Sequence, residues 1–182
     1  MKKIFAILAL AISSTAFAVD YVSVDVDNVE GRKGGSDSTA QYIRAGKSFG
    51  DYQVGIQSRT AKFTDNSVKS SVEVTTSNKN VSAFGVTPFV GIAHDNGSAT
   101  AASYSYGLVG ATYGLPVGPG YLLTGVKTRV GSTQVGDRTK QTLAFATYSL
   151  PVAKNVALNI NASRSAETIK ERALGLGLGF SF

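Results

Sequence analysis

The sequence predicts an all-β protein: a transmembrane, antiparallel, up-and-down β-barrel of ten strands. Two observations predict this fold. Apolar residues alternate with polar or small residues in one segment after another, which is the period of a strand with two different faces. The chain is also mildly apolar, with 43% hydrophobic and only 16% charged residues. After residue 18, however, it contains no run near the ~18 apolar residues that a spanning helix needs. A protein that crosses a membrane with strands satisfies both observations.

The N-terminal segment has the pattern of a secretory signal peptide. Two lysines precede an unbroken apolar run over residues 4–12, and residues 16–18 read Ala-Phe-Ala. A basic start, a short apolar run and an A-x-A site are the three parts of such a peptide, and the run is too short to be a membrane anchor. We therefore predict a cleaved signal peptide over residues 1–18 and a barrel over residues 19–182.

The composition excludes several kinds of site. The chain has no Cys, so it has no disulfide, no thiol nucleophile and no Cys-ligated metal. Its single His, His94, excludes a site built from a histidine cluster. The formal charge of +6 includes the two lysines of the predicted signal peptide, so it is weak evidence for a nucleic-acid partner. We expect no cofactor, no metal and no nucleic-acid partner.

The period-two pattern defines the expected strands. It is clearest at the C-terminus, where Leu174, Leu176 and Leu178 alternate with glycines and an alanine. An even number of strands returns both ends of a barrel to one side of the membrane. Eight strands is the alternative if residues 52–77 pair differently, and a soluble β-sandwich, which has the same period, is the rival fold. The expected strands lie near residues 20–29, 40–49, 52–63, 67–77, 81–93, 101–115, 121–131, 139–150, 155–164 and 168–182.

Turn residues predict the register of two hairpins. A Gly-Asp pair at residues 50–51 suits a two-residue turn, which pairs Phe49 with Tyr52 and places Arg44 opposite Gln57. The parities of the apolar residues on the two strands then agree.

A second hairpin is expected around residues 78–80. It pairs Val74 with Phe84 and Val72 with Val86, and it places Glu73 opposite Gly85.

Three other segments give partial information. Residues 113–117 and 148–152 both read Tyr-x-Leu-Pro-Val, which predicts two turns at the same end of the barrel. Pro88 lies inside an expected strand and predicts a bulge there. In the strands at 101–115 and 139–150, alternation alone does not select the outward face.

These features resemble small bacterial outer-membrane β-barrel proteins of the porin-like class. The resemblance rests on the signal peptide, the alternating strands and the terminal Phe182, which Phe180 and Leu178 precede at two-residue steps. It implies a location in the outer membrane of a Gram-negative cell envelope. It also implies that Leu178, Phe180 and Phe182 form an assembly signal for the barrel-assembly machinery. A fold of this kind does not by itself specify an activity.

The face assignment places a set of charged side chains in the lumen. Charges removed from bulk water are stable only when they are paired or solvated, so the lumen contains either internal ion pairs or water. The leading interpretation is a porin-like barrel that forms a narrow passive channel for small solutes. The expected lumen-lining residues are Asp25, Asp27, Arg44, Arg59, Lys69, Glu73, Lys127 and Arg129.

Two other functions remain open. A non-conducting structural or surface-interaction barrel would bind lipopolysaccharide phosphates through basic rim residues, since Arg and Lys bind phosphate well. The expected contacts are Arg32, Lys33, Lys62, Arg138, Lys140 and Arg164. A remote alternative is a barrel enzyme that acts on lipid A or on peptides. His94 would be its only candidate base, but the adjacent Asp95 points to the opposite face of a strand. We therefore expect no enzymatic activity.

Overall fold

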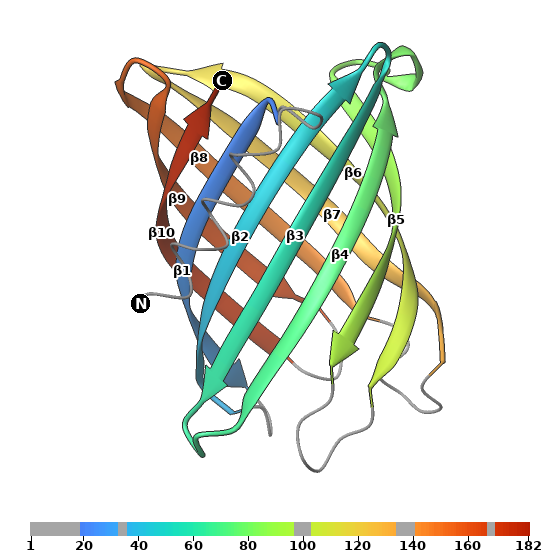
Figure 1. Cartoon of the computed structure of the whole chain (residues 1–182), viewed down its shortest axis with the longest axis vertical. Coiled ribbons are helices and arrows are strands. Elements are labelled where there is room, and N and C mark those ends of the chain that lie inside the picture. The colour runs from blue at the N-terminus through green and yellow to red at the C-terminus, as the bar shows by residue number, and fades with distance from the viewer. Residues whose placement is uncertain (1–18, 33–35, 97–102, 134–140, 167–169) are drawn as a thin grey trace.

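The computed structural model describes residues 19–32, 36–96, 103–133, 141–166 and 170–182, and ten strands contain most of them (Figure 1). The predicted signal peptide, residues 1–18, lies outside the described residues and stays a prediction. The strands are β1 (Tyr21–Arg32), β2 (Ser38–Phe49), β3 (Tyr52–Phe63), β4 (Val68–Asn78), β5 (Val86–Asn96), β6 (Tyr104–Val117), β7 (Gly120–Ser132), β8 (Thr142–Ala153), β9 (Val156–Ser165) and β10 (Lys170–Ser181).

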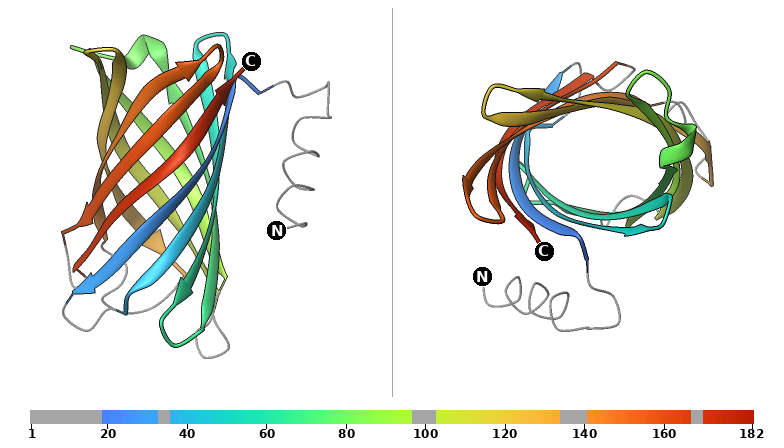
Figure 2. Two further views of the ribbon diagram at one scale, coloured as in Figure 1. Left: turned by 90° about the vertical axis from the view of Figure 1, so that its left-hand side faces the viewer. Right: turned by 90° about the horizontal axis from the view of Figure 1, so that it is seen from above.

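The strands form one closed antiparallel barrel. Each strand pairs with the next along the chain, and β1 pairs with β10 over the full length of both strands. Seen from above, the strands enclose an oval cross-section (Figure 2). The prediction of a ten-stranded barrel is confirmed, and both the eight-stranded barrel and the β-sandwich are wrong.

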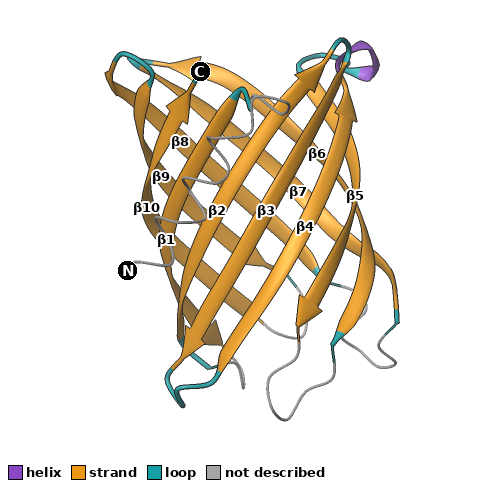
Figure 3. Cartoon of the chain, viewed as in Figure 1, coloured by secondary structure: helices purple, strands orange, loops and turns teal. Residues whose placement is uncertain are grey.

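The two ends of the barrel differ in their connections. β1 begins and β10 ends at the same end, where Tyr21 lies opposite Ser181. Tight turns join β2 to β3, β6 to β7 and β8 to β9 at that end, and the 3-10 helix η2 (Lys79–Val81) lies between β4 and β5 (Figure 3). We call this the termini end and the opposite one the loop end. No helix in the described part of the chain is long and apolar enough to cross a membrane.

The first predicted hairpin is confirmed. Phe49 pairs with Tyr52, and the ladder places Arg44 opposite Gln57. Gly50 has a φ of 58°, the left-handed conformation that a tight hairpin turn requires at this position and that glycine adopts without strain.

The second predicted hairpin is wrong. Val74 lies opposite Ile92, Val72 opposite His94 and Glu73 opposite Ala93, in place of Phe84, Val86 and Gly85. The connection is longer than expected, because η2 and a turn in which Phe84 and Gly85 both have positive φ precede β5. The register changed by an even number of residues, so each side chain keeps the face that the alternation assigned to it.

The pairing also resolves the strands whose outward face the sequence left open. Val109, Tyr113 and Leu115 face outward on β6, and Tyr148 and Leu150 do so on β8. The predicted bulge at Pro88 is wrong, since the ladder with β6 passes through Pro88 without a register shift. Pairing with β4 ends at Phe89, so no donor from Pro88 is needed on that side. A shift occurs next to Pro151 instead.

The outer face of the barrel is largely apolar, and the inner face holds most of the buried polar side chains beside two small apolar clusters. Ile92, Leu174 and Phe182 are each about two-thirds exposed on the outside. Asp25, Asp27, Asn159 and Asn161 are buried on the inside. This distribution is the reverse of that in a water-soluble domain and matches a barrel whose wall contacts lipid.

Candidate functional site

The candidate site is the lumen of the barrel. It contains a cavity of about 830 Å³, and inner-face residues from all ten strands line this cavity. Six of the eight residues predicted for the lumen line this cavity: Asp27, Arg44, Arg59, Glu73, Lys127 and Arg129. The other two occupy inner-face positions: Asp25 contacts Arg44, and Lys69 lies opposite Ala61.

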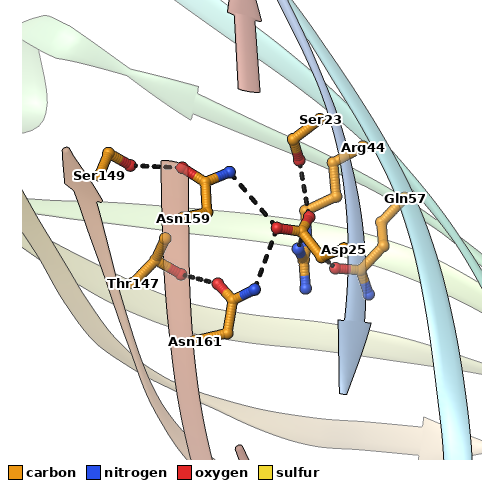
Figure 4. Close-up of polar contacts among 8 residues, drawn as sticks. All are labelled: Ser23, Asp25, Arg44, Gln57, Thr147, Ser149, Asn159 and Asn161. Atoms are coloured by element: carbon orange, nitrogen blue, oxygen red, sulfur yellow. Dashed lines mark hydrogen bonds and ion pairs between the residues drawn. The ribbon is translucent and has the colours of Figure 1, made fainter. Parts of the chain in front are cut away.

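Asp25 is the centre of a hydrogen-bond network on one wall (Figure 4). Its side chain is fully buried and forms an ion pair with Arg44. Ser23 Oγ donates to Asp25 Oδ2 at 2.9 Å, and the side-chain amides of Asn159 and Asn161 donate to Oδ1 at 3.3 and 3.0 Å. A buried carboxylate is stable where charge and hydrogen bonds compensate its lost hydration, and Asp25 has both.

The network extends over neighbouring strands, and its hydrogen bonds orient the side-chain amides of Asn159 and Asn161. Ser149 Oγ donates to Asn159 Oδ1 at 2.9 Å, and Thr147 Oγ1 donates to Asn161 Oδ1 at 2.8 Å, so both amide groups direct their nitrogens toward Asp25. On the other side, Arg44 Nε donates to Gln57 Oε1 at 2.8 Å. The contacts therefore connect β8, β9, β1, β2 and β3 into one polar wall.

Glycines on β10 make this wall possible. β10 lies between β1 and β9, and its residues beside Asp25 and Asp27 are Gly177 and Gly175. A Cβ at Gly177 would meet the Asp25 carboxylate, and a Cβ at Gly175 would meet that of Asp27. Without side chains at these positions, Asp25 crosses the inner face of β10 and reaches β9.

Two further ion pairs lie on the opposite wall. Lys127 Nζ is 2.6 Å from Glu73 Oε2 and 2.9 Å from Oε1, although β5 and β6 separate their strands. Arg129 lies 3.7 Å from the Asp95 carboxylate, which also accepts a 2.6 Å hydrogen bond from Tyr104 Oη. The pairs place fixed charges of both signs on the cavity surface.

Three predicted lumen residues, Asp27, Arg59 and Lys69, form no ion pair with any described residue. Asp27 Oδ1 and Arg59 Nε are buried and form no hydrogen bond with any described residue. Arg59 lies 6.0 Å from the ring centroid of Tyr42, and Lys69 lies 5.3 Å from that of Phe63. Both cations therefore contact the face of an aromatic ring in place of a carboxylate.

Several lumen residues were not predicted as part of the site. Asn159 and Asn161 alternate with Val156, Leu158 and Ile160 in the sequence, so their inner face was predictable. Their contact with Asp25 was not, because it depends on β1 and β10 closing the barrel. Asp95 and Tyr104 lie opposite each other on β5 and β6, and no sequence signal joins them to Arg129.

The predicted basic rim is only partly described. Lys62 and Arg164 are exposed on the outer face near the loop end, but β10, β1 and β2 separate their strands. Arg32 ends β1, and nothing is described of its side chain. Lys33, Arg138 and Lys140 lie outside the described residues.

His94 also lies on the outer face near the loop end. Its Nδ1 is 2.9 Å from Ser105 Oγ. Asp95 points to the opposite face, where it contacts tyrosines of the lumen. Among the described residues there is no group of three or more His, Cys, Asp or Glu side chains that could hold a metal ion.

Two groups outside the strands have a perturbed pKa. Lys47 Nζ and the Ser48 amide donate to the Asp20 carboxylate at 2.9 and 2.7 Å, which lowers the pKa of Asp20. In the turn between β3 and β4, Ser67 donates to Asp65 from its hydroxyl and its amide, which lowers the pKa of Asp65.

Comparisons with known proteins find similar solved structures but no matching protein family. Neither a protein-family model nor a curated relative matches the chain. Neisserial surface protein A is 12% identical over 89% of this chain and 96% of its own, with a TM-score of 0.46. The translocator domain of the autotransporter NalP from Neisseria meningitidis is 10% identical over 100% and 94%, with a TM-score of 0.45.

A third structure, the outer membrane channel DcaP of Acinetobacter baumannii, is 16% identical over 86% of this chain and 54% of its own, with a TM-score of 0.39. This chain is similar to such outer-membrane proteins in general architecture. At these identities and TM-scores, the likeness carries no conclusion about activity.

Proposed function

We propose that the chain is an integral outer-membrane β-barrel whose lumen is a narrow passive channel for small polar solutes. The observation that carries this proposal is the cavity of about 830 Å³, which all ten strands line. Its lining includes Gln53 and Ser77 near the termini end and Asp95 and Glu171 near the loop end. A cavity that reaches residues near both ends of a barrel is what a transmembrane path requires.

The outer face supports the membrane location. Valines, leucines and isoleucines are exposed around the barrel, an arrangement that would be an aggregation hazard in water and that lipid would cover. Phe49, Tyr52 and Tyr113 are exposed near the termini end, where an aromatic girdle would meet a membrane interface. Leu178 and Phe182, also exposed, belong to the C-terminal segment that we propose the barrel-assembly machinery reads.

The chemistry of the lumen favours small polar solutes. Among the described residues, the inner face carries equal numbers of acidic side chains (Asp25, Asp27, Glu73, Asp95, Glu171) and basic side chains (Arg44, Arg59, Lys69, Lys127, Arg129). A polar wall with balanced charge holds water and does not strongly exclude ions of either sign. A barrel of this strand number is narrow, so large solutes are excluded by size.

Single-channel recording in a planar bilayer tests the proposal. We expect residues 19–182, refolded and inserted, to give stable conductance steps. Arg59→Gln removes an inner-face cation that has no carboxylate partner among the described residues and should shift selectivity toward cations. Lys62→Gln on the same strand removes a cation from the outer face and should leave selectivity unchanged. A folded, inserted barrel that gives no steps would refute the channel and favour a structural barrel.

The proposal includes no catalytic step. His94 contacts Ser105, but the neighbouring Asp95 faces the lumen and does not orient the His94 ring. We expect His94→Ala to leave the lipid A mass profile of an overexpressing host unchanged. A changed profile would indicate an enzyme.

A further inference from the structure

The outer wall of the barrel has a groove near the loop end. Its volume is about 710 Å³, and its outward-facing lining includes Thr124, Ala144, Ala146, Ala162, Arg164 and Arg172, with Asn28, Glu30 and Leu174 on the side toward β1 and β10. The first four side chains are small, whereas the neighbouring outer positions on β10 are Leu174 and Leu176. These small side chains therefore form the floor of the groove. The two arginines lie on the side of the groove that is nearer the loop end.

The charge beside this groove is only partly balanced. Arg164 lies directly opposite Arg172 in the ladder between β9 and β10, and like charges in this position repel each other. Arg172 is compensated by Glu30 on β1, to which its Nε donates at 2.7 Å. Arg164 lies opposite Ala144 on its other side and forms no ion pair with any described residue.

Arg164 is thus the member of the pair whose charge no described carboxylate balances. An anion bound beside Arg164 would reduce the repulsion between Arg164 and Arg172. Two neighbouring guanidinium groups can donate hydrogen bonds to the oxygens of one phosphate.

We propose that this groove binds one phosphorylated glycolipid of the outer leaflet, of the lipid A class. Its phosphate lies on Arg164 and Arg172, and an acyl chain lies on the alanine floor. An acyl chain in the groove fills the hollow and makes van der Waals contacts with the small side chains, and the phosphate supplies the counter-charge that Arg164 lacks. The inference rests on the proposed outer-membrane location and does not depend on conduction.

Native mass spectrometry of the refolded protein, released from detergent micelles, tests this site. The probe is diphosphorylated lipid A, and folding of each variant is checked by its heat-modifiable mobility on a gel. We expect one lipid to remain bound per barrel. Arg164→Gln should weaken this binding at least tenfold. Ala162→Leu, which fills the floor with a side chain that lipid tolerates, should weaken it similarly. Lys62→Gln, an outer-face cation away from the groove, should leave binding unchanged.

Each other outcome overturns the proposal. An equal loss for Lys62→Gln would mean unspecific attraction to the basic rim. Unchanged binding in Ala162→Leu would mean that the groove holds no acyl chain. Displacement of lipid A by inorganic phosphate at equal concentration would mean a phosphate site only. A dimer that Ala162→Leu dissociates would mean that a second copy of the chain occupies the groove. Channel recordings on the same samples report separately on the lumen.

Discussion

Lys127 on β7 forms an ion pair with Glu73 on β4, with Nζ 2.6 Å from Oε2, although two strands lie between them. Both side chains are largely buried in the lumen wall. The pair therefore fixes one positive and one negative charge beside the proposed solute path. Removal of either partner leaves the other charge uncompensated at a point where the surroundings screen it less than bulk water does.

The first prediction concerns ion selectivity. Glu73→Gln leaves Lys127 without its counter-charge, so the channel should become more selective for anions. Lys127→Gln should make it more selective for cations. The reversal potential across a KCl gradient measures both changes, and we expect shifts of opposite sign.

Glu30→Gln is the matched control for this experiment. Glu30 forms a comparable pair with Arg172, with 2.5 Å between the charged atoms, but on the outer face of the barrel. The control should not move the reversal potential. Shifts of the same sign in both lumen variants would contradict the assignment of this pair to the solute path.

The second prediction concerns stability. Asp25→Ala leaves Arg44 and the amides of Asn159 and Asn161 without their acceptor. Loss of one partner of a buried ion pair costs about 3–5 kcal/mol, and because the Arg44 side chain remains 26% exposed we expect about 2 kcal/mol here. Reversible urea unfolding in micelles measures the change. The double variant Asp25→Ala/Arg44→Gln should recover part of it, and a loss that is equal in both would indicate that the ion pair contributes nothing.

The sequence was informative about which face each residue occupies and less informative about pairing across the barrel. Alternation assigned Asp25, Arg44 and Glu73 to one face because a strand has a period of two. The predicted register was wrong for the hairpin after β4, because Phe84 in the left-handed conformation and a 3-10 turn lengthen a connection that no turn motif indicated. The contact of Asp25 with Asn159 joins residues at opposite ends of the chain, and only closure of the barrel brings them together.

The third prediction concerns pH. The hydrogen bonds from Lys47 and Ser48 lower the pKa of Asp20 in the folded barrel, so they stabilise it above the pKa of the unfolded chain, about 3.9. This contribution is lost as the pH falls through the lower, folded pKa. Asp20→Asn should therefore lower the urea midpoint at pH 7, and the difference from the unmodified protein should shrink as the pH falls below about 3.9.

Asp51→Asn provides the control, because it makes the same charge change at the termini end. It should leave the urea midpoint unchanged at pH 7. A difference for Asp20→Asn that persists unchanged at pH 2 would show that the carboxylate charge is not the cause.

The fourth prediction tests why β10 carries glycines on its inner face. A Cβ at Gly177 would lie 2.6 Å from the Val24 carbonyl oxygen and would also meet the Asp25 carboxylate. A Cβ at Gly179 would have Asn159 Nδ2 as its nearest neighbour, at 3.3 Å. Gly177→Ala should therefore lower the free energy of unfolding by about 2 kcal/mol, the usual cost of overpacking. Gly179→Ala should be close to neutral, since alanine also restricts the unfolded chain. Urea unfolding of both variants provides the comparison. If both substitutions lower the free energy of unfolding equally, the glycines are needed for the backbone conformation of β10. The space beside Asp25 would then not be the reason for Gly177.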